Sequence, residues 1–487
     1  MVVYKSIEEV HNHAKKAVGK TVFELNESQN IPYTKSSVGD AFENWFGKVK
    51  DSSSKPDIEE VGVELKATPF KKLKNGQFSA KERLVLNIIN YNKIVNETFE
   101  DSHFLYKNGK MEIAFYEYLK DVPKDQWTIY ETIFLELAKN PKDLEVIKND
   151  WEKITEYVKM GRAHELSESL TNYLAPCTKG ANSKSVRTQP YSTKKAKQRA
   201  YSLKSSYMTS ILRKYIFGDE EHDSIIKDRF ELKGKDLETI VLERFEPYKG
   251  WSIEKLKQKF SITTNSYQIN YQIAAAMLNL NGRYGKSDSF NKVEEFKKAS
   301  ILLKTVKFNE NNVNKESMSF PAFDFEEISK ESWFNEKGEP SAYWHNFLLD
   351  TRFLFFVVKE ENGIDIFKGV KFFSMPESDL QGPVRQVWED TVYKIRNGVE
   401  LEAIKWGNDI RILNNFISKS DGMICHVRPH EQKSDYTVNG KHSSRLPVNA
   451  KWINKPDSPK YSNQWMTRQC FWINNSYIRE KVKHLLL

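Results

Sequence analysis

The feature that most constrains the fold of this chain is an internal repetition. Three pairs of segments resemble one another and occur in the same order in the two halves of the 487-residue sequence. The pairs are "SIEEVHNHAKKAVGKT" (6–21) with "SIEKLKQKFSITT" (252–264), "EEVGVELKATPF" (59–70) with "EEFKKASILLKTVKF" (294–308), and "AYSLKSSYM" (200–208) with "CFWINNSYI" (470–478). Each match is weak alone, but their shared order predicts a duplicated domain and two related folding units.

Each half contains apolar strand patterns set among helical ones. The runs "EIAFYEYL" (112–119) and "FLFFVVKE" (353–360) are typical of strands in a central sheet. Ser6 and Ser252 each precede helical apolar spacing and are predicted to cap a helix. We therefore expect an α/β (α+β) fold with two tandem domains, each a mixed central sheet flanked by helices.

Charge is distributed unevenly along the chain. Lys plus Arg number 75 against 66 for Asp plus Glu, so the formal net charge of +9 weakly favours an anionic partner. From Ser169 to Gly218 there is no acidic residue, whereas ten Lys and Arg fall inside this segment. A run of lysines can simply be a solvated face, but here Tyr191, Tyr201 and Tyr207 are interleaved with it. This mixture favours contact with nucleic acid.

The acidic segment "GDEEHDSIIKD" that begins at Gly218 indicates the edge of a domain. We expect a first domain at 1–218, a linker at 219–250 and a second domain at 251–487. The early acidic residues of "MVVYKSIEEV" do not fit a signal peptide, and "FLFFVV" (353–358) is too short to span a bilayer. Three cysteines without CxxC spacing argue against a disulfide framework, so a cytoplasmic protein without a membrane partner is expected.

The segment "KPDIEEVGVELKATP" (55–69) contains a candidate catalytic set of Asp57, Glu64 and Lys66. Glu64 and Lys66 would share one face of a strand while Val63 and Leu65 point into the core. Two converging carboxylates favour Mg²⁺, and a nearby Lys can neutralise charge on a phosphate. Random placement would give acid-x6-acid-x-base about 1.4 times in such a chain, so the spacing alone proves little. The "PD" start, the apolar strand and the acid-free basic segment together favour a PD-(D/E)xK nuclease core.

Three further segments resemble the MutH family of DNA endonucleases, in particular its restriction-enzyme branch. They are "SVGDAFENWFG" (37–47), "SKPDIEEVGVELKATPF" (54–70) and "RAYSLKSSYM" (199–208). The resemblance implies a Mg²⁺-dependent type II restriction endonuclease that cleaves double-stranded DNA at GATC as a monomer or dimer on DNA. It implies that Asp57 and Glu64 bind the metal together with the main-chain carbonyl of Leu65, and that Lys66 is catalytic.

The same resemblance implies two further active-site residues. Glu43 occupies the Glu position of a "G-x-x-x-E-x-x-x-G" segment that the family places beside the active site. From the residues alone, an exposed helical Glu is the simpler interpretation. Lys107 in "EDSHFLYKNG" matches a second catalytic Lys, with Lys110 as a competing candidate.

Base recognition in the first half departs from the family pattern. An "R-P" pair in the family's DNA-reading loop is replaced by "LAPCTKGA", with Ala175 in the place of Arg. From charge and position, Lys179, Arg187, Tyr201 and Lys204 are predicted to contact DNA instead. The "R-P" pair occurs in the second half as Arg428 and Pro429.

The second half is expected to bind DNA without cutting it. Leu302 stands at the position of Glu64, Lys304 keeps the position of Lys66, and Asn291 or Lys292 falls near that of Asp57. Met277 is the counterpart of Glu43. Without carboxylates this half cannot hold Mg²⁺, so an allosteric effector site is predicted, with a structural scaffold as the alternative. The alternative for the whole chain is a non-catalytic DNA-binding regulator with a vestigial nuclease site, and the intact set in the first half weighs against it.

Overall fold

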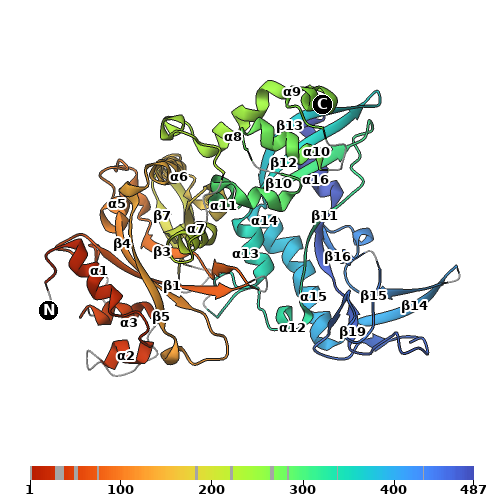
Figure 1. Cartoon of the computed structure of the whole chain (residues 1–487), viewed down its shortest axis with the longest axis horizontal. Coiled ribbons are helices and arrows are strands. Elements are labelled where there is room, and N and C mark those ends of the chain that lie inside the picture. Colours follow the sequence, from red (N-terminus) through yellow and green to blue (C-terminus); the bar gives the residue numbers. More distant parts are fainter. Residues whose placement is uncertain are drawn as a thin grey trace. The chain divides into compact units, whose positions relative to one another are not determined.

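A computed structural model of the chain describes residues 3–27, 38–48, 53–73, 76–180, 185–219, 223–263, 268–281, 284–336, 338–407, 409–431 and 433–487 (Figure 1). The chain packs as two compact units. Unit 1 comprises Met1–Phe245, Ala274–Leu302 and Asp350–Arg352, and unit 2 comprises Glu246–Ile273, Leu303–Leu349 and Phe353–Leu487. Two segments from the second half of the sequence therefore belong to unit 1.

Unit 1 contains a four-stranded sheet in the order β2-β1-β4-β5. Strands β1 and β4 are parallel, whereas β2 and β5 pair antiparallel with their neighbours. The bounds are β1 (Glu64–Lys72), β2 (Phe78–Ala80), β4 (Lys110–Glu117) and β5 (Ile129–Glu136). Helices α1 (Ile7–Lys15), α2 (Val22–Glu27) and α3 (Val38–Trp45) share an apolar core with Val63 and Leu65. The strand alternation thus buries Leu65 under these helices and directs Glu64 and Lys66 to the other face.

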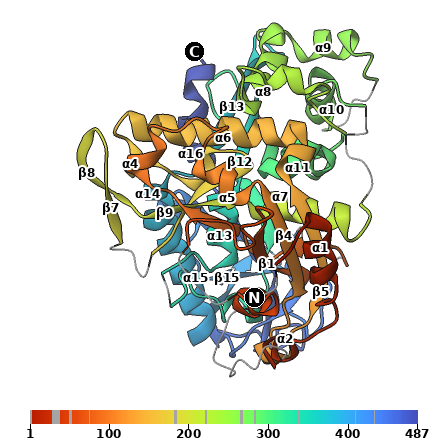
Figure 2. The ribbon, with the colours of Figure 1, turned by 90° about the vertical axis from the view of Figure 1, so that its left-hand side faces the viewer.

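A second sheet of unit 1 has the order β3-β9-β6, and its pairs are antiparallel. Every residue of the central strand β9 is buried. The separate antiparallel hairpin of β7 and β8 extends away from this sheet (Figure 2). The strands are β3 (Leu84–Ile88), β6 (Leu174–Thr178), β7 (Val186–Gln189), β8 (Ser192–Lys197) and β9 (Arg199–Leu203). The helices are α4 (Tyr91–Ile94), α5 (His103–Asn108), α6 (Pro141–Lys159), α7 (Ser205–Tyr215), α8 (Leu237–Phe245) and α11 (Glu294–Ala299).

Unit 2 is built on sheets with the orders β10-β12-β13 and β11-β20-β16, and it carries a further sheet, β15-β14-β18, and the pair β17-β19. Its strands are β10 (Ile301–Phe308), β11 (Met318–Ala322), β12 (Arg352–Glu361), β13 (Ile364–Ser374), β14 (Glu400–Trp406), β15 (Asp409–Asn414), β16 (Cys425–Arg428), β17 (Ser443–Arg445), β18 (Lys451–Trp452), β19 (Trp465–Thr467) and β20 (Cys470–Ile473). Its helices are α9 (Ile253–Lys259), α12 (Phe325–Ile328), α13 (Tyr343–Asp350), α14 (Glu377–Asp379), α15 (Arg385–Asn397) and α16 (Asn475–Val482). Helix α10 (Ile269–Met277) has residues in both units.

The predicted α/β class is confirmed by this topology, and the sheet orders agree with the predicted duplication, which stays a prediction. The order β11-β20-β16 repeats β3-β9-β6, and the outer pair is irregular in both, between Ser319 and Ala322 and between Val85 and Ile88. A helix follows each central strand directly, α7 after β9 and α16 after β20. The predicted caps are also present, since Ser6 and Ser252 accept bonds of 3.2 Å from the backbone three residues later.

The predicted linker at 219–250 differs in structure from an extended connection. It contains α8, whose Leu237, Ile240 and Val241 are buried, and unit 1 continues to Phe245. The boundary between two functional domains at residue 218 therefore stays a prediction, and compact unit 1 extends beyond that residue. Among the described helices, none is both long and apolar enough to cross a membrane.

Candidate active site and nucleic-acid interface

Glu64 lies at the start of β1 and is only 2% exposed. Its Oε1 accepts a hydrogen bond of 2.6 Å from Lys66 Nζ, and Lys107 Nζ lies 3.7 Å from the same oxygen. Burial raises the pKa of Glu64, while the neighbouring Lys66 lowers it. The predicted pairing of Glu64 with Lys66 on one strand face is therefore present, and Lys107 joins it from α5.

A tight turn brings Asp57 back to β1. Ile58 and Val63 form an isolated antiparallel bridge, and Gly62 in the turn adopts a positive φ of 67° that favours glycine. Asp57 Oδ2 accepts a hydrogen bond of 2.9 Å from the backbone N–H of Leu65. The carboxyl of Asp57 thus lies beside the peptide that follows Glu64, as the sequence predicts.

Helix α5 holds the segment that leads into this turn. Lys107 Nζ donates to the carbonyls of Ser53 and Lys55 at 2.9 and 3.1 Å, and His103 Nε2 lies 2.6 Å from the carbonyl of Ser54. Lys110, the competing candidate, begins β4 and pairs in register with Glu136. Sequence reasoning missed His103, although its i, i+4 spacing from Lys107 places both side chains on one helix face.

Glu43 on α3 completes the charged cluster. Burial is the main reason that its pKa is raised from 4.5 to about 7, with a further contribution from the charge of Asp57, while Lys66 lowers it. The simpler interpretation, an exposed helical Glu, is wrong, because Glu43 is half-buried and interacts electrostatically with Asp57, Lys66 and Glu64.

The residues fit a divalent metal. Oε2 of Glu64 is buried and has no hydrogen-bond partner among the described residues, so a bound cation would satisfy it. Within the described ranges, no group of three or more His, Cys, Asp or Glu side chains is arranged to hold a metal. Asp57, Glu64 and the Leu65 carbonyl would therefore leave several positions to water, as Mg²⁺ prefers.

Two of the four predicted DNA contacts of the first half lie on the surface. Lys179 follows β6 and Arg187 belongs to β7, and both are exposed. Lys194, Lys195 and Lys197 of β8 are exposed as well, so the hairpin presents a basic surface. Residues 181–184, which include Lys184 of the basic segment, lie outside the described residues.

The other two predicted contacts, Tyr201 and Lys204, are corrected by the structure. Tyr201 lies in the central strand β9, is 3% exposed, and packs its ring 5.0 Å from that of Phe104. Lys204 is 1% exposed and donates 2.7 Å to the carbonyl of Thr171, and burial lowers its pKa to about 8. The acid-free stretch therefore includes a buried strand, and these two residues stabilise the fold.

In the second half, Arg428 ends β16 and is exposed. Its guanidinium lies 3.9 Å from the ring of Trp472, and Trp472 Nε1 donates to the Arg428 carbonyl. Leu302 and Lys304 lie on β10, and Met277 is 2% exposed in α10. The strand that corresponds to β1 thus carries no acidic residue between Ile301 and Phe308.

Comparison with known proteins agrees with this geometry. The family model for the DNA mismatch repair enzyme MutH matches residues 46–150, a range that holds Asp57, Glu64, Lys66 and Lys107. Type II restriction enzyme Sau3AI of Staphylococcus aureus is 61% identical over 490 residues, which cover 100% of both chains. DNA mismatch repair protein MutH of Shewanella woodyi is 29% identical over 218 residues, 43% of this chain and 91% of the relative. The MutH of Pasteurella multocida is 25% identical over 185 residues, 37% and 81% of the two chains.

Glu43 is expected to make the metal-free protein less stable as the pH rises from 4.5 to about 7. In this window the folded state keeps a proton on Glu43 that the unfolded state has released. The free energy of unfolding of the parent should fall relative to that of Glu43→Gln, and the difference should level off at higher pH. Denaturant unfolding in EDTA across this range measures it. The exposed Glu8→Gln is the matched control, and a difference that does not vary with pH for Glu43→Gln would contradict the raised pKa.

Replacing Lys194, Lys195 and Lys197 of β8 together by Ala should weaken DNA binding for all sequences alike. Each lost phosphate contact also reduces the salt dependence, so the slope of log affinity against log salt should shrink by up to about 3. Fluorescence anisotropy with a duplex at several salt concentrations measures both quantities. Replacing the exposed Lys5, Lys16 and Lys93 controls for net charge. If the two triple variants behave alike, the hairpin is only a solvated face.

Proposed function

The chain belongs to the MutH-related family of type II restriction enzymes, and on that premise we propose that it cleaves double-stranded DNA at GATC sites with Mg²⁺ as cofactor. The proposal rests on the cluster of Asp57, Glu64 and Lys66. Within the described residues, Oε2 of Glu64 in this cluster has no hydrogen-bond partner. The GATC preference rests on the resemblance of the motifs to MutH. We place the activity in the cytoplasm, where DNA is accessible.

Each residue of the cluster has a distinct role in this proposal. Asp57, Glu64 and the Leu65 carbonyl would hold Mg²⁺, which when bound supplies Lewis acidity and a water of lowered pKa. Lys66 carries the positive charge that neutralises charge developing on the scissile phosphate. Lys107 and His103 hold segment 53–55 and thereby position Asp57. Glu43, whose pKa is about 7, can hold or release a proton near the reacting groups at neutral pH.

The basic surface supplies substrate binding. Lys179, Arg187 and the β8 lysines are exposed, and their charges suit the phosphate backbone of a duplex. This assignment gives position and affinity but no base readout, since phosphate contacts carry no sequence information directly.

We further propose that the second half is an effector module, which binds a second GATC duplex and favours the active form of the nuclease. Two observations support this role. The strand β10 lacks the carboxylates that a metal would need. Arg428 is exposed and stacked on Trp472, and its guanidinium suits bidentate contact with guanine. A second half that keeps an exposed Arg428 but has no acidic residue on β10 fits binding without chemistry.

Glu64→Ala and Lys66→Ala should abolish cleavage and leave binding to a GATC duplex within about threefold of the parent, because they remove chemistry and not the basic surface. Plasmid cleavage in Mg²⁺ and in EDTA, alongside anisotropy with the duplex, measures both. Glu59→Ala, on the exposed part of the same turn, is the matched control and should cut normally. Cleavage by either site variant within a few-fold of the parent would refute the assignment. DNA binding by the parent without Mg²⁺-dependent cutting would favour the regulator alternative.

The effector role predicts faster cutting when the second site is occupied. A plasmid with several GATC sites should be cut faster than one with a single site, and a short GATC duplex added in trans should stimulate the single-site reaction. Arg428→Ala should reduce the stimulation, whereas Arg445→Ala, also exposed in unit 2, should not. Equal rates on all substrates would leave the second half as a scaffold.

A further inference from the structure

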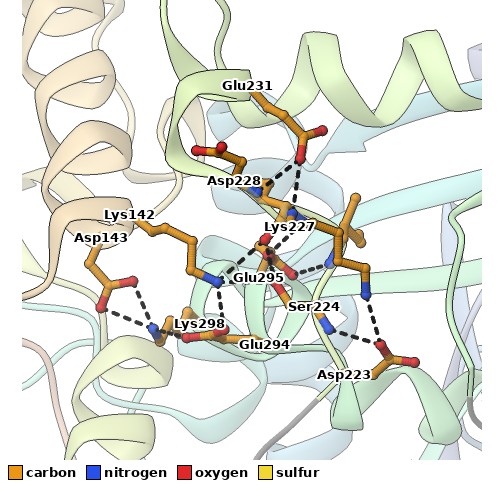
Figure 3. A network of polar contacts seen from close by, with 12 residues as sticks. Lys142, Asp143, Asp223, Ser224, Lys227, Asp228, Glu231, Glu294, Glu295 and Lys298 are labelled. Atoms are coloured by element: carbon orange, nitrogen blue, oxygen red, sulfur yellow. Dashed lines mark hydrogen bonds and ion pairs between the residues drawn. The ribbon is translucent and has the colours of Figure 1, made fainter.

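Helix α11 belongs to the second half by sequence and to unit 1 by packing. In the repeat, "EEFKK" (294–298) corresponds to the start of "EEVGVELKATPF" (59–70), which forms the turn between Asp57 and β1. Here the same stretch carries Glu294, Glu295 and Lys298, which point into unit 1 (Figure 3). This stretch of the second half thus makes a set of polar contacts within unit 1.

Lys298 makes the central contact of this set. Its ammonium is buried and lies 2.7 and 2.9 Å from the two carboxylate oxygens of Asp143, in the first turn of α6, and 2.6 Å from Glu294. Tyr207 of α7 donates to Asp143 Oδ2, and the Tyr207 and Tyr173 rings lie within 6 Å of the ammonium. One cation thus links α6, α7 and the residue before β6.

Glu295 fixes the other side of α11. Its carboxylate is 3% exposed and accepts bonds from Ser224 Oγ at 2.6 Å and from the backbone N–H groups of Ile225 and Ile226 at 2.9 and 3.0 Å. Lys142 bridges the two sides, since its ammonium lies 3.5 Å from Glu294 and 3.3 Å from Ser224 Oγ (Figure 3). When one contact of such a buried network breaks, both of its groups are left without a partner. We therefore expect the members of the network to move together.

The backbone is constrained where the chain leaves α11. Ser300 has a left-handed conformation with φ of 55°, and its carbonyl accepts a bond of 3.0 Å from the N–H of Arg352. Arg352 in turn donates 2.6 Å to Asn172 and pairs with Glu238, all inside unit 1. Ser300 directly precedes β10, and Arg352 is the first residue of β12, so both lie where the chain enters the sheet β10-β12-β13.

We propose that α11 is a coupling element by which the second half of the chain sets the position of α6, β6 and α7 in the nuclease unit, with Lys298 as its positioning residue. The proposal deepens the proposed function, because β6 leads to Lys179 and the basic hairpin. Among the described residues, none of the contacts of Lys298 involves Asp57, Glu64, Lys66 or Glu43. Loss of the Lys298 ammonium should therefore weaken substrate binding more than it slows the chemical step.

The test uses the full-length protein with Lys298→Met, the conservative Lys298→Arg, and Lys235→Met as the control for an exposed ion pair in the same unit. Lys298→Met should raise KM for a GATC duplex about tenfold while kcat changes less than about twofold, and Lys298→Arg should recover most of the loss. Hydrogen exchange of the metal-free protein should quicken in 141–150, 172–178, 205–212 and 223–232, and stay unchanged in 355–372. Lys235→Met should match the parent in both.

Unchanged KM and unchanged exchange in Lys298→Met would overturn the proposal, as would a fall in kcat with KM preserved. If Lys298→Met does not fold, Glu295→Gln provides the milder perturbation, and the same exchange pattern is expected. The exchange readout does not depend on cleavage. If the parent does not cleave DNA but exchange in Lys298→Met quickens in these segments, the proposed function is refuted and the coupling element is supported. If the parent cleaves DNA but exchange in Lys298→Met is unchanged, the proposed function is supported and the coupling element is refuted.

Discussion

The architecture of the active site depends on burying the Glu64 carboxylate. A carboxylate at 2% exposure loses most of its hydration, and only close positive charge or donors can compensate that loss. Lys66 on the same strand supplies one ammonium at 2.6 Å, and α5 supplies Lys107. The parallel pairing of β1 with β4 then matters, because α5 leads directly into β4 and is held beside β1 by that pairing. Within the described part of the chain the second oxygen of Glu64 has no hydrogen-bond partner, and a cation bound there would offset its burial.

Much of this site could be predicted from the sequence because its signals are local. Strand periodicity predicts that Glu64 and Lys66 share one face, and the Ser caps predict where α1 and α9 begin. Six intervening residues are enough for the chain to turn and bring Asp57 back beside β1. The environment of Glu43 was accessible only through family resemblance, since a helical Glu carries no mark of burial in its own sequence. His103 was missed for a related reason. Its i, i+4 spacing from Lys107 places the two side chains on one helix face, but the backbone carbonyl beside its Nε2 lies 49 residues away and local spacing does not reveal it.

The errors arise where charge was taken as a guide to exposure. Tyr201 and Lys204 sit in a segment without acids, yet β9 is the central strand of its sheet and is buried along its length. A Lys can be buried when a carbonyl accepts a hydrogen bond from its ammonium, as the Thr171 carbonyl does for Lys204, and that acceptor is 33 residues away. The extent of unit 1 was also beyond local reasoning. Its inclusion of 274–302 and 350–352 depends on packing between residues more than a hundred positions apart.

The discontinuous composition of unit 1 has a consequence for synthesis of the protein. A ribosome that has completed Phe245 has still to make the segments 274–302 and 350–352 that finish this unit. At about 5–20 residues per second, the roughly hundred residues up to Arg352 take about 5–20 s, during which the nuclease lacks Lys298 and Arg352. Unit 1 of a nascent chain is thus incomplete until Arg352 has been made, when somewhat less than half of the second half has been synthesised. The order of translation therefore delays completion of the unit that holds Asp57, Glu64 and Lys66.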